Sequence, residues 1–439
     1  MLTTVLPLIL LGLGADPSSE RIDRASAMTS AAAKPRAADG TRAHRKWQTF
    51  PLKHGPIGER DKNIQMMIMN YARSEPKRPA QLKGLPEGVS ESVSYYVAKV
   101  AQRELLMAVD PDEKPRLYAD TDFDGDLSDE KAVPVLPAEN KGTSRPAGRH
   151  HFGPIALAAA DAKGNAAAKM TAEWRQPGFV FLRPAGCLSG KVRLAGKEHR
   201  VVLIDGSCNG RCNDTWSPSG EPMTSWMGDF DIIAVDRNGN GTFDLPRGGP
   251  SAKALKEMEV QPLTKALRIE ETYYEVNVAA DGSKIRLAKL PSECGTLDLG
   301  SKGLELMVLC DAGFDYLELP DGKTEVRTGE YMAILSFLSR TDAKGATWKL
   351  SGGRGSGKLV KFEIQKGKTL KIKAGPPLVL KTDVIKQPGT VSIGFSAVGQ
   401  AGEAYAGGAE KDGKRPDAPT LKILDEKGKV LAEGAFKYG

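Results

Sequence analysis

The chain has 439 residues, with 48 glycines, 28 prolines and an aromatic fraction of only 6%. This length exceeds one ordinary domain, and frequent Gly and Pro favour many short strands joined by tight turns while excluding an architecture of long helices. The net charge is +7, and after Ala343 basic side chains outnumber acidic ones two to one. We therefore expect an all-β protein with several antiparallel sheets or β-sandwiches in tandem.

An apolar segment, Val5 to Leu13, lies near the N-terminus and is followed by small residues. Its length suits the apolar part of a secretory signal peptide and is too short to span a bilayer, although no Lys or Arg precedes Arg21. A buried N-terminal strand is the alternative. We predict a signal peptide over residues 1–15, a disordered linker over 16–46, and a secreted, periplasmic or cell-surface location. No later segment is apolar for long enough to form a membrane helix, so we expect no transmembrane span.

The first predicted folded unit covers residues 47–155. Side chains alternate with period two over Tyr95 to Lys99 and Leu105 to Val109, and a short strand, Arg116 to Ala119, leads into an acidic loop. This loop offers oxygen atoms at its positions one, three, five, seven and nine, from Asp120, Asp122, Asp124, the carbonyl of Asp126, and Ser128. Gly125 at position six suits a sharp turn.

The second predicted unit, residues 156–290, contains two weaker copies of this loop. Each copy follows an apolar run, Val201 to Ile204 or Ile232 to Val235, and each has glycine at position six. The candidate oxygen ligands are Asp205, Ser207, Asn209 and Asn213 in the second loop, and Asp236, Asn238, Asn240 and Asp244 in the third. Further along, the Asp281-Gly282 turn between two apolar runs is a strong hairpin signal.

A third unit is predicted over residues 291–377. Its Pro320-Asp321-Gly322 turn, followed by Gly329-Glu330-Tyr331, resembles the β-sandwiches of the transthyretin-like and carboxypeptidase-regulatory-like kind. The resemblance covers about one fifth of the chain and implies a β-sandwich there. The last segment, 378–439, is long enough for a small immunoglobulin-like β unit, or it completes the preceding sandwich.

The three acidic loops resemble the calcium loops of the EF-hand, dockerin and thrombospondin type-3 families in their order of oxygens and glycine. The resemblance implies calcium as a structural cofactor. Position twelve, where such loops carry a bidentate acid, is Lys131, Trp216 or Arg247 here, and strands instead of helices flank the loops. We therefore expect hairpin-borne loops of modest affinity, with the missing ligand supplied from elsewhere or by water. The alternative for each loop is a polar β-turn without metal.

The five cysteines also leave alternatives open, because an odd number in a secreted chain leaves at least one thiol unpaired or paired outside the chain. Cys208 with Cys212, and Cys294 with Cys310, are candidate disulfides in an oxidising compartment. Five buried thiols are the alternative, since a chain of this length folds without covalent links. The fifth cysteine is Cys187. A zinc site is disfavoured because four ligands are not supplied at short range.

No catalytic motif is found in the sequence. The glycine-rich segment Ser351 to Lys358 nearly matches a phosphate-binding loop, but Leu359 follows where Ser or Thr is needed and the next residues alternate as a strand. We therefore expect no nucleotide. His150 and His151 have no partner at motif spacing and are expected in a solvated loop.

Two functions are compatible with this pattern, which as a whole resembles secreted bacterial multi-domain β proteins with repeated acidic loops. We favour a secreted structural or binding protein with calcium-stabilised β domains. The basic C-terminal segment fits an acidic polysaccharide or a cell-envelope component as partner, or it is only the solvated face of strands; no nucleic acid is expected. The alternative is an extracellular hydrolase of polysaccharide or another polymer, with a carboxylate pair hidden among residues such as Asp229 and Asp231.

Overall fold

The computed structural model describes residues 46–58, 64, 70–100, 103–137, 148–158, 169–175, 178–194, 196–217, 230–245, 255–353, 356–387 and 390–435. The expected all-β architecture of several antiparallel sheets is confirmed. Within these ranges, the one helical element with defined ends is the 3-10 turn η2 (Gly357–Leu359). The predicted signal peptide and nearly all of the predicted linker lie outside the described residues.

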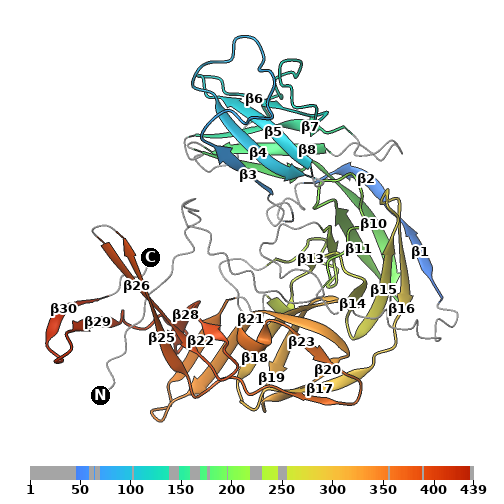
Figure 1. Ribbon diagram of the computed structural model, residues 1–439. Coiled ribbons are helices and arrows are strands. Elements are labelled where there is room, and N and C mark those ends of the chain that lie inside the picture. Colours follow the sequence, from blue (N-terminus) through green and yellow to red (C-terminus); the bar gives the residue numbers. More distant parts are fainter. Residues whose placement is uncertain are drawn as a thin grey trace, which may run out of the picture.

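The N-terminal half contains a seven-stranded sheet in the order β6-β5-β4-β3-β9-β8-β7 (Figure 1). Its strands are β3 (Asn70–Glu75), β4 (Ser94–Val100), β5 (Arg103–Asp110), β6 (Arg116–Ala119), β7 (Arg149–Ala156), β8 (Lys169–Arg175) and β9 (Phe179–Pro184). Val133 bridges to Leu117 of β6, and Val135 bridges to Phe152 of β7. The sheet therefore closes on itself around one apolar core, and we call it the closed sheet.

Four further sheets form stacked layers. Layer 1 has the order β1 (Gln48–Pro51), β16 (Lys284–Lys289), β15 (Thr272–Val278), β14 (Ala266–Ile269). Layer 2 has the order β13 (Val260–Pro262), β12 (Ile232–Val235), β11 (Lys197–Ile204), β10 (Gly186–Leu194), β2 (Lys53–Pro56). Layer 3 has the order β19 (Gly313–Leu319), β18 (Leu304–Cys310), β21 (Gly329–Thr341), β22 (Thr347–Gly352), β28 (Gly408–Lys411), with β23 (Phe362–Ile364) also on β21. Layer 4 has the order β20 (Lys323–Arg327), β17 (Cys294–Asp298), β24 (Thr369–Lys371).

Apolar cores separate these layers. Strand β12 shows the principle, because Ile233 and Val235 pack toward layer 1 while Ile232 and Ala234 pack toward layer 3. Layers 2 and 3 are thus buried on both faces, which explains the continuous apolar runs in their strands. A further core lies between layers 3 and 4. The expected Asp281-Gly282 hairpin joins β15 and β16, with the Gly282 N–H donating to the Ala279 carbonyl over 2.8 Å.

The C-terminal part adds two small sheets. β25 (Val379–Gln387), β26 (Thr390–Val398) and β27 (Ala404–Tyr405) form one sheet, and β29 (Thr420–Leu424) pairs with β30 (Val430–Ala435) in the other. The base of the first sheet is anchored by Ala397 and Tyr405, which belong to the core between layers 3 and 4.

The strands do not all follow the predicted division of the chain. β8 and β9, in the range assigned to the second unit, pair with β7 and β3 of the closed sheet. β1 and β2, from the first predicted unit, pair with β16 and β10, and β28 of the last unit pairs with β22 in layer 3. The alternation of side chains within a strand shows which face is buried, but it does not show which distant strand is the hydrogen-bond partner. The sequence therefore did not predict these strand pairs.

Candidate metal centre

Each acidic loop follows the end of a strand that the sequence predicted. Loop 1 (residues 120–130) follows β6, loop 2 (205–214) follows β11, and loop 3 (236–244) follows β12. Because β11 and β12 are antiparallel neighbours, loops 2 and 3 lie at opposite ends of layer 2. The loops are thus attached to rigid elements, which hold their first residues in place.

The aspartate at position one organises each loop. Backbone N–H groups of positions five and six donate to the carboxylate of Asp120 over 3.1 Å each. Asp205 accepts the equivalent pair over 3.2 and 2.7 Å, and Asp236 accepts N–H groups of Gly239 and Gly241 over 2.7 and 3.0 Å. The sequence therefore identified the residues that shape the loops, although these bonds also occur in metal-free turns.

A second acid completes each loop, and the sequence did not identify it as a ligand. The N–H of position two donates to Glu130 in loop 1 over 2.5 Å, to Asp231 in loop 2 over 3.1 Å, and to Glu259 in loop 3 over 2.6 Å. We call these three residues the companion acids. Asp231 and Glu259 immediately precede β12 and β13, the strands that pair with the strand before each loop. These two acids thus reach their loops from the neighbouring strand and not from position twelve.

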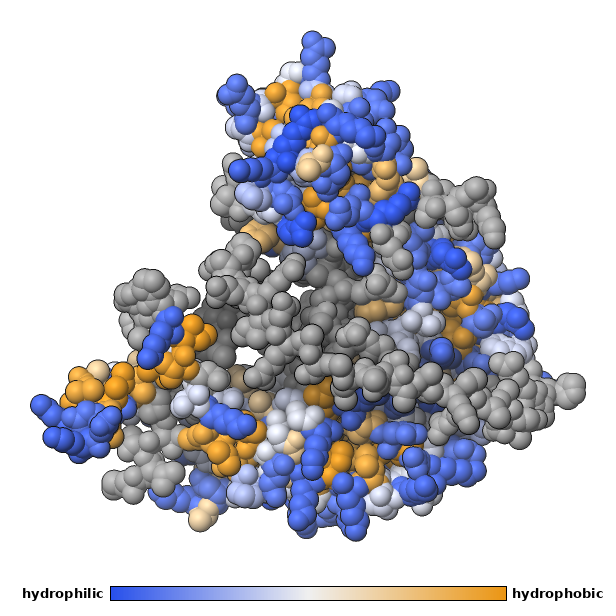
Figure 2. Space-filling view, in the orientation of Figure 1, coloured by the Kyte–Doolittle hydropathy of each residue, from blue (hydrophilic) through white to orange (hydrophobic). Residues whose placement is uncertain are grey.

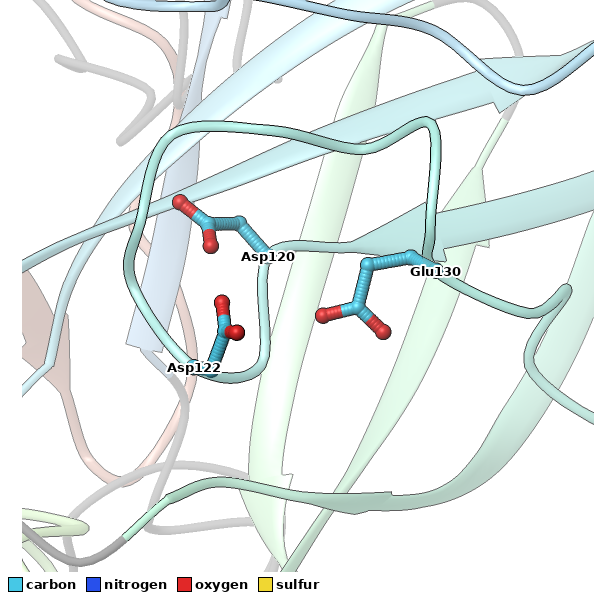
Figure 3. Close-up of side chains that lie close together, drawn as sticks. All are labelled: Asp120, Asp122 and Glu130. Atoms are coloured by element: carbon cyan, nitrogen blue, oxygen red, sulfur yellow. The ribbon is translucent and has the colours of Figure 1, made fainter.

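Loop 1 gathers the densest group of carboxylates. Oxygens of Asp120, Asp122 and Glu130 lie within 4.8 Å of one another, and so do oxygens of Asp122, Asp124 and Asp129. Figure 3 shows the Asp120 and Asp122 carboxylates turned into the loop, with Glu130 on the other side of the segment that joins them. Asp122 belongs to both groups, which together comprise five acids of the same loop. Among the described residues, groups of at least three such acids occur in loop 1 and nowhere else. These oxygens form a site that can hold a metal ion.

The segment before β4 supports loop 1 from outside. Lys83 donates its backbone N–H to the Gly125 carbonyl over 2.7 Å and its ammonium group to the Asp124 carbonyl over 2.6 Å. Gly125 has a φ of +82°, and a Cβ there would lie 2.8 Å from the Gln81 carbonyl oxygen. Only glycine fits this position without moving the backbone. The backbone of loop 1 is therefore held in place by contacts with this segment.

Asp126 and Ser128, the two other residues predicted as ligands in loop 1, are joined by a hydrogen bond. Asp126 accepts the N–H of Ser128 over 2.8 Å, which lowers the pKa of the Asp126 carboxyl. Among the carboxylates of loop 1, the structure brings together Asp120, Asp122 and Asp124 from the predicted set, and adds Asp129 and Glu130.

Loops 2 and 3 satisfy their acids with amide groups. Asp214 accepts hydrogen bonds from Ser207 over 3.0 Å and from the Asn209 side chain over 2.6 Å. Asp244 accepts bonds from Asn238 and Asn240 over 2.6 and 3.2 Å. The side-chain oxygen of Asn213, the predicted ligand at position nine of loop 2, accepts a bond from Arg211 instead. Loop 1 is therefore the stronger candidate for a cation.

Burial changes the acidity of the leading aspartates. It raises the pKa of Asp120 to about 6 and that of Asp205 to about 6, and the charge of a nearby aspartate adds to each shift. Burial likewise raises the pKa of Asp231, which also faces the charge of Asp205. Holding these groups ionised in the metal-free chain is thus unfavourable, and a bound cation would remove the penalty.

These shifts predict a pH dependence for the metal-free protein. An acid whose pKa rises from 3.8 to about 6 on folding binds its proton more tightly in the folded chain, so its contribution favours folding at low pH and is lost as the pH rises through this window. The Asp205→Asn variant has no carboxyl at this position and should gain stability relative to wild type over the same window. Thermal unfolding of both proteins at several pH values, without metal, measures this. If the difference in unfolding midpoint between Asp205→Asn and wild type does not change with pH, the raised pKa of Asp205 is contradicted. Asp321→Asn, which changes an exposed aspartate, is the control.

All five cysteines are free in the structure. Cys208 packs into the core of the closed sheet, whereas Cys212 packs between layers 1 and 2. Cys310 is buried between layers 3 and 4, and Cys294 is half-buried on β17. Neither candidate disulfide is present in the structure, and four of the five thiols are buried while Cys294 is half-buried. Burial raises the pKa of the Cys208 and Cys212 thiols.

Other residues singled out in the sequence have different places in the fold. His150 and His151 lie on β7, so the expectation of a solvated loop was wrong; the His150 ring lies 5.5 Å from the Trp174 ring. The glycine-rich segment contains the short turn η2, where the Lys358 N–H donates to the Ala401 carbonyl over 2.8 Å. Asp229 lies outside the described residues.

The geometry thus defines a multi-sheet β protein with an acidic cluster at the end of one hairpin. No protein-family model, curated protein or solved structure matches the chain. Within the described residues, no helix has both the length and the apolar character needed to cross a membrane.

Proposed function

We propose that this protein is a secreted structural or binding protein whose β domains are stabilised by calcium, with loop 1 as the principal site. The observation that carries the proposal is the pair of carboxylate groups that share Asp122, one with Asp120 and Glu130 and the other with Asp124 and Asp129. Calcium takes six to eight oxygen ligands and tolerates irregular geometry, and a cluster made only of carboxylates matches that preference. Asp120 and Glu130 would hold the ion at the two ends of the loop, and Asp122 between them.

A location outside the cytoplasm is consistent with the modest calcium affinity expected of loop 1. Extracellular calcium modules bind with dissociation constants of about 10⁻⁴ to 10⁻³ M, so a loop with a shortened ligand set is adequate outside the cytoplasm. Loops 2 and 3 would bind more weakly, because side-chain amides already donate hydrogen bonds to the carboxylates of Asp214 and Asp244. The expected signal peptide over residues 1–15 is the second support for a secreted protein.

Calcium titration of the metal-stripped protein tests the proposal. We expect saturable binding of at least one ion per chain by isothermal titration calorimetry, with a weaker response to magnesium, which needs a more regular octahedral site. Asp122→Ala should reduce affinity at least tenfold, since Asp122 belongs to both carboxylate groups. The control Asp321→Asn removes an exposed acid from an ordinary turn and should bind as wild type. The absence of binding, or equal binding by the Asp122 variant, would refute the proposal.

A further inference from the structure

The C-terminal part carries a strand with an uncovered edge. Among the described strands, β25 is the end strand of its sheet and pairs with β26 alone. Nine consecutive residue pairs join the two strands without a register shift, so β25 is long and regular and contains no proline. An edge of this kind presents unpaired backbone N–H and C=O groups and is a template for another strand.

Apolar side chains accompany this edge on both faces of the strand. Val379 and Ile385 are 61% and 60% exposed, and Leu380 and Val384 are 44% and 53% exposed. Figure 1 shows the β25–β26 hairpin extending outward beside β22 and β28, and Figure 2 shows apolar residues gathered over the same arm. Proteins often protect such edges with proline, a bulge, a covering segment or charged side chains. β25 contains no proline and no bulge, and within the described part of the chain its protection is limited to charged side chains such as Lys381 and Lys386.

The sequence of β25 is complementary to itself when two copies run antiparallel. With Thr382 opposite its own counterpart, Val379 faces Ile385 and Leu380 faces Val384 of the second copy. Lys381 then faces position 383, which is an aspartate in the sequence. Directly opposed residues share one face of an antiparallel pair, where apolar and opposite-charge pairs are stabilising.

Charge also selects this register over its neighbours. Centring the pair on Lys381 places that lysine opposite itself, and centring it on position 383, an aspartate in the sequence, again opposes two like charges, which is unfavourable. Only an alignment about Thr382 combines both apolar pairs with the Lys381 attraction. The match is between a surface and its own copy, as a two-fold symmetric interface requires.

We propose that two copies of this chain associate through antiparallel pairing of their β25 edges about Thr382, which forms one continuous sheet in the order β26-β25-β25-β26. On one face of this sheet, Leu380 and Val384 of both copies lie next to Ile393, the partner of Val384 in β26. The proposal is independent of calcium binding, because loop 1 belongs to another part of the chain.

The register is tested by a cysteine at the symmetry axis. Directly opposed residues have Cα atoms about 4.5 to 5.5 Å apart, which suits a disulfide, so the full-length Thr382→Cys variant should form a disulfide-linked dimer on mild oxidation. Lys386→Cys is the matched control on the same strand, since its two copies would lie far apart along the pair. The wild-type protein, oxidised in the same way, shows how much cross-linking the five native cysteines cause. Failure of Thr382→Cys to cross-link, or equal cross-linking by both variants, would overturn the register.

Association itself is tested by sedimentation velocity over a dilution series. Wild type should shift from dimer to monomer on dilution, because a single strand pair buries a small interface. The double variant Val384→Lys/Ile385→Lys should remain monomeric, whereas Leu431→Lys, which alters a similarly exposed residue on β30 (64% exposed), should behave as wild type. All three positions are exposed, so folding should not change. A monomeric wild type at every concentration, or equal loss of dimer in Leu431→Lys, would overturn the proposal.

Discussion

Calcium should raise the midpoint of thermal unfolding of the metal-stripped protein, and a chelator should reverse the gain. A ligand at one hundred times its dissociation constant stabilises the folded state by about 2.7 kcal/mol per site. For a unit of the size of the closed sheet, this corresponds to a shift of about 10 °C. The physical reason is that the five acids of loop 1 repel one another, so the folded chain gains when a cation holds them together.

The effect should depend on the loop and not on general screening of charge. Sodium chloride at equal ionic strength should give a smaller shift, because a coordinated ion binds more tightly than the diffuse ions that screen charges. Asp122→Ala should lose most of the calcium-dependent shift while melting normally without metal, since Asp122 is exposed. An unchanged wild-type midpoint, together with no calcium in the isolated protein, would contradict the metal site.

The sequence predicted the strands better than their arrangement. The alternation around Tyr95 to Lys99 and the apolar runs before Asp205 and Asp236 correspond to β4, β11 and β12, because each pattern reflects the burial of its own residues. The stacking of layers 2 and 3 depends on contacts between distant strands, such as those that bring Met307 and Phe337 against the core with Ile232. No local pattern specifies such partners.

The same distinction applies to the acidic loops. Glycine at position six and oxygens at alternate positions are local requirements of a tight turn, so the sequence shows them directly. The companion acids Asp231 and Glu259 are brought in by strand pairing, and their distance in sequence from Asp205 and Asp236 depends on the length of the intervening connections. A useful signal is nevertheless present, since each of them immediately precedes an apolar strand that could pair with the strand before the loop.

The largest effect of a single substitution in the loops should come from Asp231→Ala. Asp231 is fully buried, and its two carboxylate oxygens accept the N–H groups of Gly206 over 3.1 Å and Asp214 over 2.8 Å. Removing the carboxylate leaves both donors without that acceptor where water has little access, and each such buried group costs about 1 to 3 kcal/mol. We expect a loss of about 3 kcal/mol in the free energy of unfolding, measured by urea denaturation.

Asp281 offers a matched comparison that separates burial from hydrogen bonding. It also accepts two hydrogen bonds, from the N–H and the hydroxyl of Ser283 over 3.0 and 2.8 Å, but it lies on the exposed turn between β15 and β16. Water can replace the lost acceptor there, so Asp281→Ala should cost less than about 1 kcal/mol. Asp231→Asn should fall between the two alanine variants, because an amide keeps one acceptor oxygen and lacks the charge that faces Asp205. If Asp231→Ala and Asp281→Ala lower the free energy of unfolding equally, Asp231 does not hold β11 and β12 together at loop 2. Asp231 would then have no structural role as a companion acid.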